Sequence, residues 1–150
     1  MLELNYVGVD RMSKNNMLRI LPALALLIFM SWAVVQADTG SSSIFLDIVQ
    51  FLPYGDKVGH FFLYGLLALL TVIACNYKCV QVKGYQVPLG AIIVLSLAII
   101  EEITQIFMIN RTFDLVDVLA DIAGVCCFIF ILNKYRATRV NSVKQSALSS

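Results

Sequence analysis

Four long apolar runs dominate the pattern of hydrophobic and polar positions along the chain, and short polar connections separate them. The runs cover about residues 17–36, 57–76, 87–109 and 114–133. An α-helix needs about 20 apolar residues to cross the roughly 30 Å hydrocarbon core of a bilayer. The pattern therefore predicts an all-α fold, namely a polytopic membrane protein built as a four-helix transmembrane bundle.

The segment between the first two runs, residues 38–55, contains an apolar stretch that is too short to cross a membrane. Its apolar residues recur on one helical stripe, which comprises Ile44, Phe45, Ile48, Val49 and Leu52. Such a stripe is typical of an amphipathic helix that lies in the membrane interface. We therefore expect a short interfacial helix here, which Pro53-Tyr54-Gly55 would end.

The other connections are short. Residues 77–86 predict a loop and residues 110–113 a tight connection between the third and fourth runs. Asp56 and Asp114 stand at the starts of the second and fourth runs, where N-cap residues are expected.

Composition supports a membrane protein and narrows its partners. Of the 150 residues, 59% are hydrophobic and 14% are charged, whereas a soluble domain has roughly 45–50% apolar and about 25% charged residues. We expect one membrane domain over residues 1–150, with tails over 1–16 and 134–150. The net charge of +1 argues against nucleic acid as a partner. For a membrane protein, membrane lipids are the expected partners. The cysteines, at positions 75, 79, 126 and 127, lack metal-site spacing, and we expect free thiols, no metal and no cofactor.

Basic residues gather on one side of the predicted bundle. They are Arg11, Lys14, Arg19, Lys78, Lys83, Lys134, Arg136, Arg139 and Lys144. The opposite side carries Lys57 and Arg111 beside several aspartates. Because positive charge is enriched in cytoplasmic segments, both termini are predicted to be cytoplasmic and residues 38–56 to lie outside. A cleavable signal peptide is the alternative interpretation of the first run, since Val35-Gln36-Ala37 resembles a cleavage site.

The later three runs carry polar residues on single helical faces and at matching depths. Counted at 1.5 Å per residue, the outer layer comprises Asp56, Lys57, Arg111 and Asp114; the middle layer His60, Gln105 and Asp117; and the deep layer Tyr64, Glu101, Glu102 and Asp121. An ionised carboxylate at membrane depth costs about 2.5–3.5 kcal/mol, so such residues usually serve a function. We expect these faces to meet around an acidic, outward-facing polar cavity. The basic side chains Lys57, His60 and Arg111 are too few for its carboxylates, which predicts shared protons, raised carboxylate pKa values or a bound cation.

These residues resemble the VanZ-like family of bacterial membrane proteins. The matching pattern is Asp56-Lys57-x-x-His60-x-x-x-Tyr64, then Glu102-x-x-Gln105, Arg111, Asp117 and Gly124. Asp121 departs from the family, which more often has asparagine there. The family takes its name from a member linked to resistance against the glycopeptide teicoplanin. The resemblance therefore implies a role in the cell envelope and a place in the bacterial cytoplasmic membrane.

Three functions remain open on the sequence. The first is a non-catalytic cell-envelope factor that binds a lipid headgroup, a glycopeptide-type ligand or a partner membrane protein. The second is an enzyme acting on a lipid-linked or cell-wall substrate, with acid–base chemistry by His60, Glu102 or Asp117. The third is a proton- or cation-coupled transporter.

The orientation can be tested by labelling cysteines introduced at Ser42 and Ser146. A membrane-impermeant thiol reagent applied to intact cells should label position 42 and leave position 146 unlabelled until the cells are opened. Labelling of position 146 from outside would reverse the assigned orientation.

Overall fold

The computed structural model describes residues 14–39, 53–108 and 113–148, with side chains described as far as Arg139 in the last helix. Its elements are α1 (Lys14–Asp38), α3 (Gly55–Ala74), β1 (Cys79–Val82), β2 (Tyr85–Pro88), α4 (Leu89–Gln105) and α5 (Leu115–Leu148). The described chain is mostly helical, which confirms the predicted class. The expected interfacial helix lies largely within residues 40–52, outside the described residues.

Three helices are long and apolar enough to cross a membrane: Met17–Ala37 in α1, Gly55–Ala74 in α3 and Leu115–Arg139 in α5. They correspond to the first, second and fourth predicted spans. The third prediction, residues 87–109, was too long, because residues 87 and 88 belong to β2 and α4 ends at Gln105. With 17 residues, α4 is about 25 Å long at 1.5 Å per residue. In the other direction, α5 continues well past residue 133.

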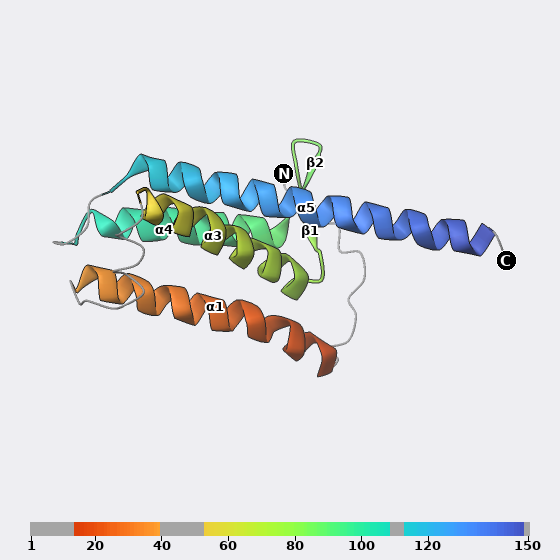
Figure 1. Cartoon of the computed structure of the whole chain (residues 1–150), viewed down its shortest axis with the longest axis horizontal. Coiled ribbons are helices and arrows are strands. Elements are labelled where there is room, and N and C mark those ends of the chain that lie inside the picture. Colours follow the sequence, from red (N-terminus) through yellow and green to blue (C-terminus); the bar gives the residue numbers. More distant parts are fainter. Residues whose placement is uncertain (1–13, 40–52, 109–112, 149–150) are drawn as a thin grey trace.

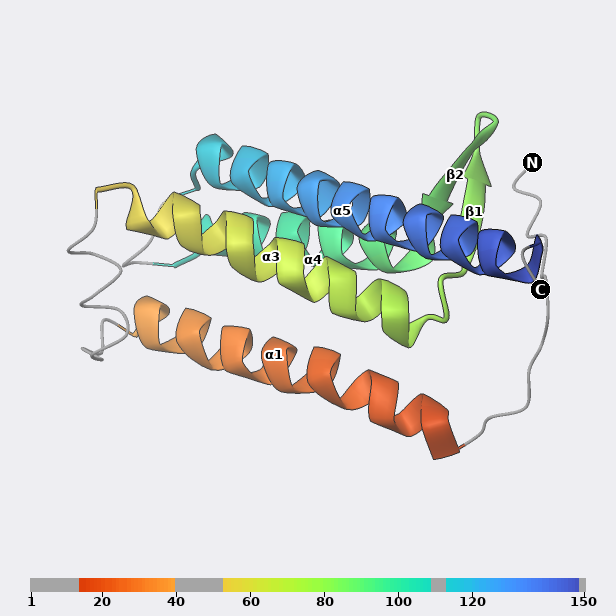
Figure 2. The ribbon, with the colours of Figure 1, turned by 45° about the vertical axis from the view of Figure 1, so that its right-hand side comes forward.

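The helices run alternately up and down, and α3 is the central one (Figure 1). It packs against α1, α4 and α5, and its largest interface is with α5. The start of α3, the end of α4 and the start of α5 lie at the same end of the molecule, on the left in Figures 1 and 2. Residues far apart in sequence are thereby brought to one place.

Small residues let the central helices approach closely. Gly124 of α5 lies against the backbone of Phe61 in α3, and a Cβ at Gly65 would be 2.9 Å from the carbonyl oxygen of Gly124. Gly90 of α4 is packed in the same way against the backbone of Val72. The apolar core between the helices comprises Met30, Tyr64, Leu67, Ala68, Ala91, Val94, Ala98 and Val125.

The connection predicted as a loop over residues 77–86 is instead part of a β-hairpin. Strands β1 and β2 pair antiparallel, with Val82 opposite Tyr85 and Val80 opposite Val87. Lys83 and Gly84, at φ values of 49° and 85°, form the two-residue turn, and such backbone angles suit the twist of a tight hairpin. In the sequence, apolar residues alternate with glutamine on both sides of Lys83-Gly84, and this alternation indicates a hairpin rather than a loop.

The predicted N-cap role of Asp56 is also wrong. Helix α3 begins at Gly55 behind Tyr54, which has a left-handed φ of 60° and makes no side-chain capping bond. Asp56 lies inside the first turn, where a carboxylate still interacts favourably with the positive end of the helix dipole. Its side chain is free to point toward Lys57 instead, as described below.

At the opposite end of the bundle, the end of α3 contacts both flanking helices. The guanidinium of Arg19 donates a 2.6 Å hydrogen bond to the side-chain oxygen of Asn76. The guanidinium of Arg136 lies 4.0 Å from the centre of the Tyr77 ring, a cation–π contact. These contacts join α1 and α5 to the residues that follow α3.

The close contact at Gly124 predicts a large effect for one added methyl group. Gly124→Ala would place its Cβ against the backbone of Phe61, which cannot move aside as a side-chain end can. We expect a loss of about 2 kcal/mol or more in the free energy of unfolding, measured by thermal unfolding in detergent. Gly59→Ala is the matched control, because a Cβ at Gly59 meets nothing within 4 Å. Equal stability of the two variants would contradict the close packing of α3 and α5.

Candidate functional site

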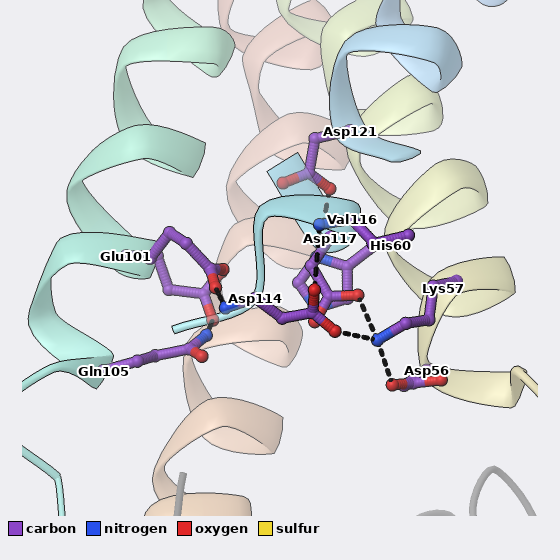
Figure 3. A network of polar contacts seen from close by, with 10 residues as sticks. Asp56, Lys57, His60, Glu101, Gln105, Asp114, Val116, Asp117 and Asp121 are labelled. Atoms are coloured by element: carbon purple, nitrogen blue, oxygen red, sulfur yellow. Dashed lines mark hydrogen bonds and ion pairs between the residues drawn. The ribbon is translucent and has the colours of Figure 1, made fainter. Parts of the chain in front are cut away.

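Polar side chains from three helices converge where α3 and α5 begin and α4 ends (Figure 3). We name this group the polar cluster; it comprises Asp56, Lys57, His60, Tyr64, Glu101, Glu102, Gln105, Asp114, Asp117 and Asp121. These are the residues that the sequence singles out, except Arg111, which lies outside the described residues. The structure therefore brings together side chains that the sequence places only on separate helical faces.

Lys57 holds the outer part of the polar cluster together. Its ammonium nitrogen lies 2.7 Å from a carboxylate oxygen of Asp56, 2.6 Å from one of Asp114 and 2.9 Å from one of Asp117. The Lys57 side chain is 22% exposed and that of Asp117 only 7%. Because a partly buried pair is screened less than a surface pair, this arrangement fixes the start of α3 against the start of α5.

Asp114 both caps α5 and binds Lys57. One carboxylate oxygen accepts a 2.9 Å hydrogen bond from the backbone N–H of Val116, which satisfies a donor that the helix leaves open. The other oxygen accepts from Lys57. The Lys57 hydrogen bond and then the Val116 N–H hold the pKa of Asp114 below its ordinary value. The predicted capping role of Asp114 is confirmed.

His60 and Asp121 form a pair deeper in the polar cluster. The Nδ1 atom of His60 lies 3.0 Å from Oδ1 of Asp121, and the side chains are 12% and 1% exposed. A carboxylate at Nδ1 fixes the orientation of the imidazole and leaves Nε2 for another partner. The His60 ring stacks on Tyr64, with centroids 5.8 Å apart and planes inclined by 15°. This contact agrees with the predicted stripe that places both residues on one face of α3.

Tyr64 joins α3 to α4 through a hydrogen bond. Its hydroxyl donates to one carboxylate oxygen of Glu101, and the side-chain amide of Gln105 donates to the other at 3.0 Å. Glu101 and Gln105 are four residues apart on α4, so they lie on the same face. Together these bonds position the Glu101 carboxylate at the edge of the polar cluster.

Glu102 is almost completely buried, with 1% of its surface exposed. Its Oε1 accepts a 2.7 Å hydrogen bond from the backbone N–H of Asp114. This contact differs from the predicted layers, which put Glu102 well below Asp114. The long glutamate side chain and the backbone at the start of α5 meet across that difference, and side-chain depth counted from Cα positions does not capture such reach.

Burial increases from the helix ends inward. The exposed fraction of the side chain falls from 56% at Asp56 and 37% at Asp114 to 7% at Asp117 and 1% at Asp121. Acid also exceeds base: six carboxylates of the polar cluster face the side chains of Lys57 and His60. Among the described residues, no group of three or more His, Cys, Asp or Glu is placed to hold a metal ion.

Apolar helices of membrane-spanning length define this chain as a helical membrane protein, and carboxylates are buried between these helices. A family model described as VanZ/LLP1 matches residues 2–136. The chain therefore belongs to the VanZ/LLP1 family, as the motif on α3, α4 and α5 indicates. No curated protein and no solved structure matches this chain.

The arrangement around Lys57 predicts that losing this one cation destabilises the polar end of the bundle. In Lys57→Met the Asp117 carboxylate would stay buried without its cation, which is more costly than losing a surface pair. We expect the Tm in detergent to fall by roughly 5 °C. Lys83→Met, in the exposed hairpin turn, should leave the Tm within about 1–2 °C. A Tm for Lys57→Met equal to that of the parent protein would show that the ion pairs contribute nothing to stability.

Proposed function

We propose that this VanZ/LLP1 protein is a non-catalytic factor of the bacterial cell envelope that binds a ligand in the polar cluster. In this proposal four helices span the cytoplasmic membrane as one domain, both termini are cytoplasmic, and the polar cluster opens outward. The ligand is a lipid headgroup, a glycopeptide-type molecule or a partner membrane protein. The supporting observation is the group of buried carboxylates Glu102, Asp117 and Asp121 on α4 and α5, helices that otherwise present apolar surfaces.

Several features support binding over a purely structural role. Lys57 is the cation that pairs with the outer carboxylates, whereas Glu102 and Asp121, each at 1% exposure, pair with no lysine or arginine of the described chain. A buried ion pair is weak support for stability, because well-packed apolar side chains usually serve as well or better. The polar cluster is costly to bury, and its exposure falls steadily from the helix ends inward. Both properties suit the binding of a ligand better than a purely structural role.

The polar cluster contains six carboxylates, a lysine, a histidine, a tyrosine and a glutamine, but no serine, threonine or cysteine. A covalent mechanism of the Ser–His or Cys–His type therefore has no nucleophile among these residues. This composition favours binding over acyl transfer.

An enzyme is the second candidate, and the His60–Asp121 pair favours it. A buried carboxylate on Nδ1 sets up Nε2 as a general base or acid. In such an enzyme, His60 would move the proton and Asp121 would orient the ring, with Glu102 or Asp117 as the second acid–base group. The substrate would be a lipid-linked or cell-wall molecule that reaches the outer end of the bundle.

Substitutions in the polar cluster test the proposal in cells in which the protein gives a measurable envelope phenotype, such as glycopeptide tolerance. We expect Glu102→Ala and Asp121→Ala to abolish the phenotype while membrane insertion is retained or improved, because a buried charge is removed. Asp121→Asn should be the mildest change, since the family more often has asparagine there.

Ser96→Ala is the control on α4, because the Ser96 hydroxyl bonds only to its own helix, at the carbonyl of Ile92, and lies on an exposed face. Unchanged function in Glu102→Ala would overturn the proposal. His60→Ala separates the two candidates: a binding factor should retain part of its function, whereas a general acid–base catalyst should lose about 10²–10⁴-fold in rate.

A further inference from the structure

We propose that the inner end of the polar cluster, between Glu102 and Asp121, receives a primary ammonium group of the ligand. This inference rests on the proposed function, since it names the chemistry that the same site recognises. The group can be carried by an aminophospholipid headgroup or by a soluble amine. Both present the same cation, with N–H donors, to the buried carboxylates.

The charge balance of the inner end calls for a cation. Lys57 is bound by the outer carboxylates of Asp56, Asp114 and Asp117. Neither Glu102 nor Asp121 is paired with a lysine or arginine of the described chain. Even with His60 protonated and Arg111 counted, carboxylates outnumber basic groups by two to one. A phosphate or carboxylate ligand would add to this excess, whereas an ammonium group would reduce it.

Two buried oxygens supply the acceptors. Oε2 of Glu102 and Oδ2 of Asp121 have no hydrogen-bond partner among the described residues, although both side chains are 1% exposed. Their sister oxygens are held in place, Oε1 of Glu102 by the Asp114 N–H and Oδ1 of Asp121 by His60. Each carboxylate is thus oriented by one oxygen and offers the other. A buried acceptor without a donor is costly, so a ligand group that donates to either oxygen gains a hydrogen bond there.

The type of cation follows from these acceptors. Lys57 shows that an ammonium fits among the carboxylates of this chain, with contacts of 2.6–2.9 Å. Among the described residues no group of three ligands is placed for a metal ion. A quaternary ammonium has no N–H to donate and is usually held by aromatic faces. Oxygen acceptors therefore select a primary ammonium over its fully methylated counterpart.

A lipid titration at neutral pH tests this chemistry on the purified full-length protein in detergent. The added probes are phosphatidylethanolamine, phosphatidylcholine with the same acyl chains, phosphatidylglycerol, and ethanolamine alone; the readout is the rise in Tm with concentration. We expect phosphatidylethanolamine to bind about tenfold more tightly than phosphatidylcholine, because methylation removes every N–H donor. The double variant Glu102→Gln/Asp121→Asn should fold and bind both lipids alike. Ser96→Ala should keep the tenfold preference.

The outcomes separate the sources and the two proposals. If phosphatidylethanolamine is preferred tenfold over phosphatidylcholine and ethanolamine alone does not raise the Tm, the ammonium belongs to a lipid. If ethanolamine raises the Tm as much as phosphatidylethanolamine does, the ammonium belongs to a soluble amine. Equal binding of the two zwitterionic lipids, or a preference that survives in the double variant, overturns the ammonium site. If that happens while Glu102→Ala still abolishes the envelope phenotype, the proposed function stands. If phosphatidylethanolamine is preferred while Glu102→Ala keeps the full envelope phenotype, the ammonium site stands and the envelope role is overturned.

Discussion

The contact of the Lys57 ammonium with three carboxylates is the interaction on which the polar end of this structure depends. It lies where α3 and α5 begin, and its partners Asp56, Asp114 and Asp117 come from both helices. Without a cation here, several carboxylates would repel one another at the edge of an apolar bundle. Asp114 connects this interaction to the helix itself, since the same carboxylate caps the N–H of Val116. Charge pairing and helix capping are therefore satisfied by one side chain.

The pairing of His60 with Asp121 depends on how closely the backbones of α3 and α5 approach each other. Gly124 of α5 lies against Phe61 of α3, and His60 directly precedes Phe61. Asp121 lies three residues before Gly124, on the same face of α5. The contact between backbones therefore fixes the vertical offset that places His60 Nδ1 3.0 Å from Asp121. A bulkier residue at position 124 would change the geometry of the polar cluster without touching any polar group.

The sequence predicts the helices and their polar faces, because hydrophobic run length and 3.6-residue periodicity are local properties. The match of Asp56, His60 and Tyr64 to one stripe is of this kind. Which carboxylate meets which donor depends on the relative rotation and offset of helices, and local periodicity carries no such information. The bond between Glu102 and the Asp114 N–H is an example. The hairpin at Lys83-Gly84 was missed for a different reason: its strands have four residues each, so their alternation is brief.

The distribution of charge within the polar cluster bears on why these residues are present at all. If stability alone had selected them, the excess acid would lie where water screens it and the buried part would be balanced. In the described structure the buried part is not balanced. Lys57 pairs with Asp56 and Asp114, which are partly exposed, and with the buried Asp117, while Glu102 and Asp121 are buried at 1% exposure and are held by a backbone N–H and a histidine. Apolar side chains at those two positions would cost nothing in desolvation. Two positions at which folding gains little from a carboxylate are thus occupied by carboxylates, and this is the observation from which the proposed ligand site is argued.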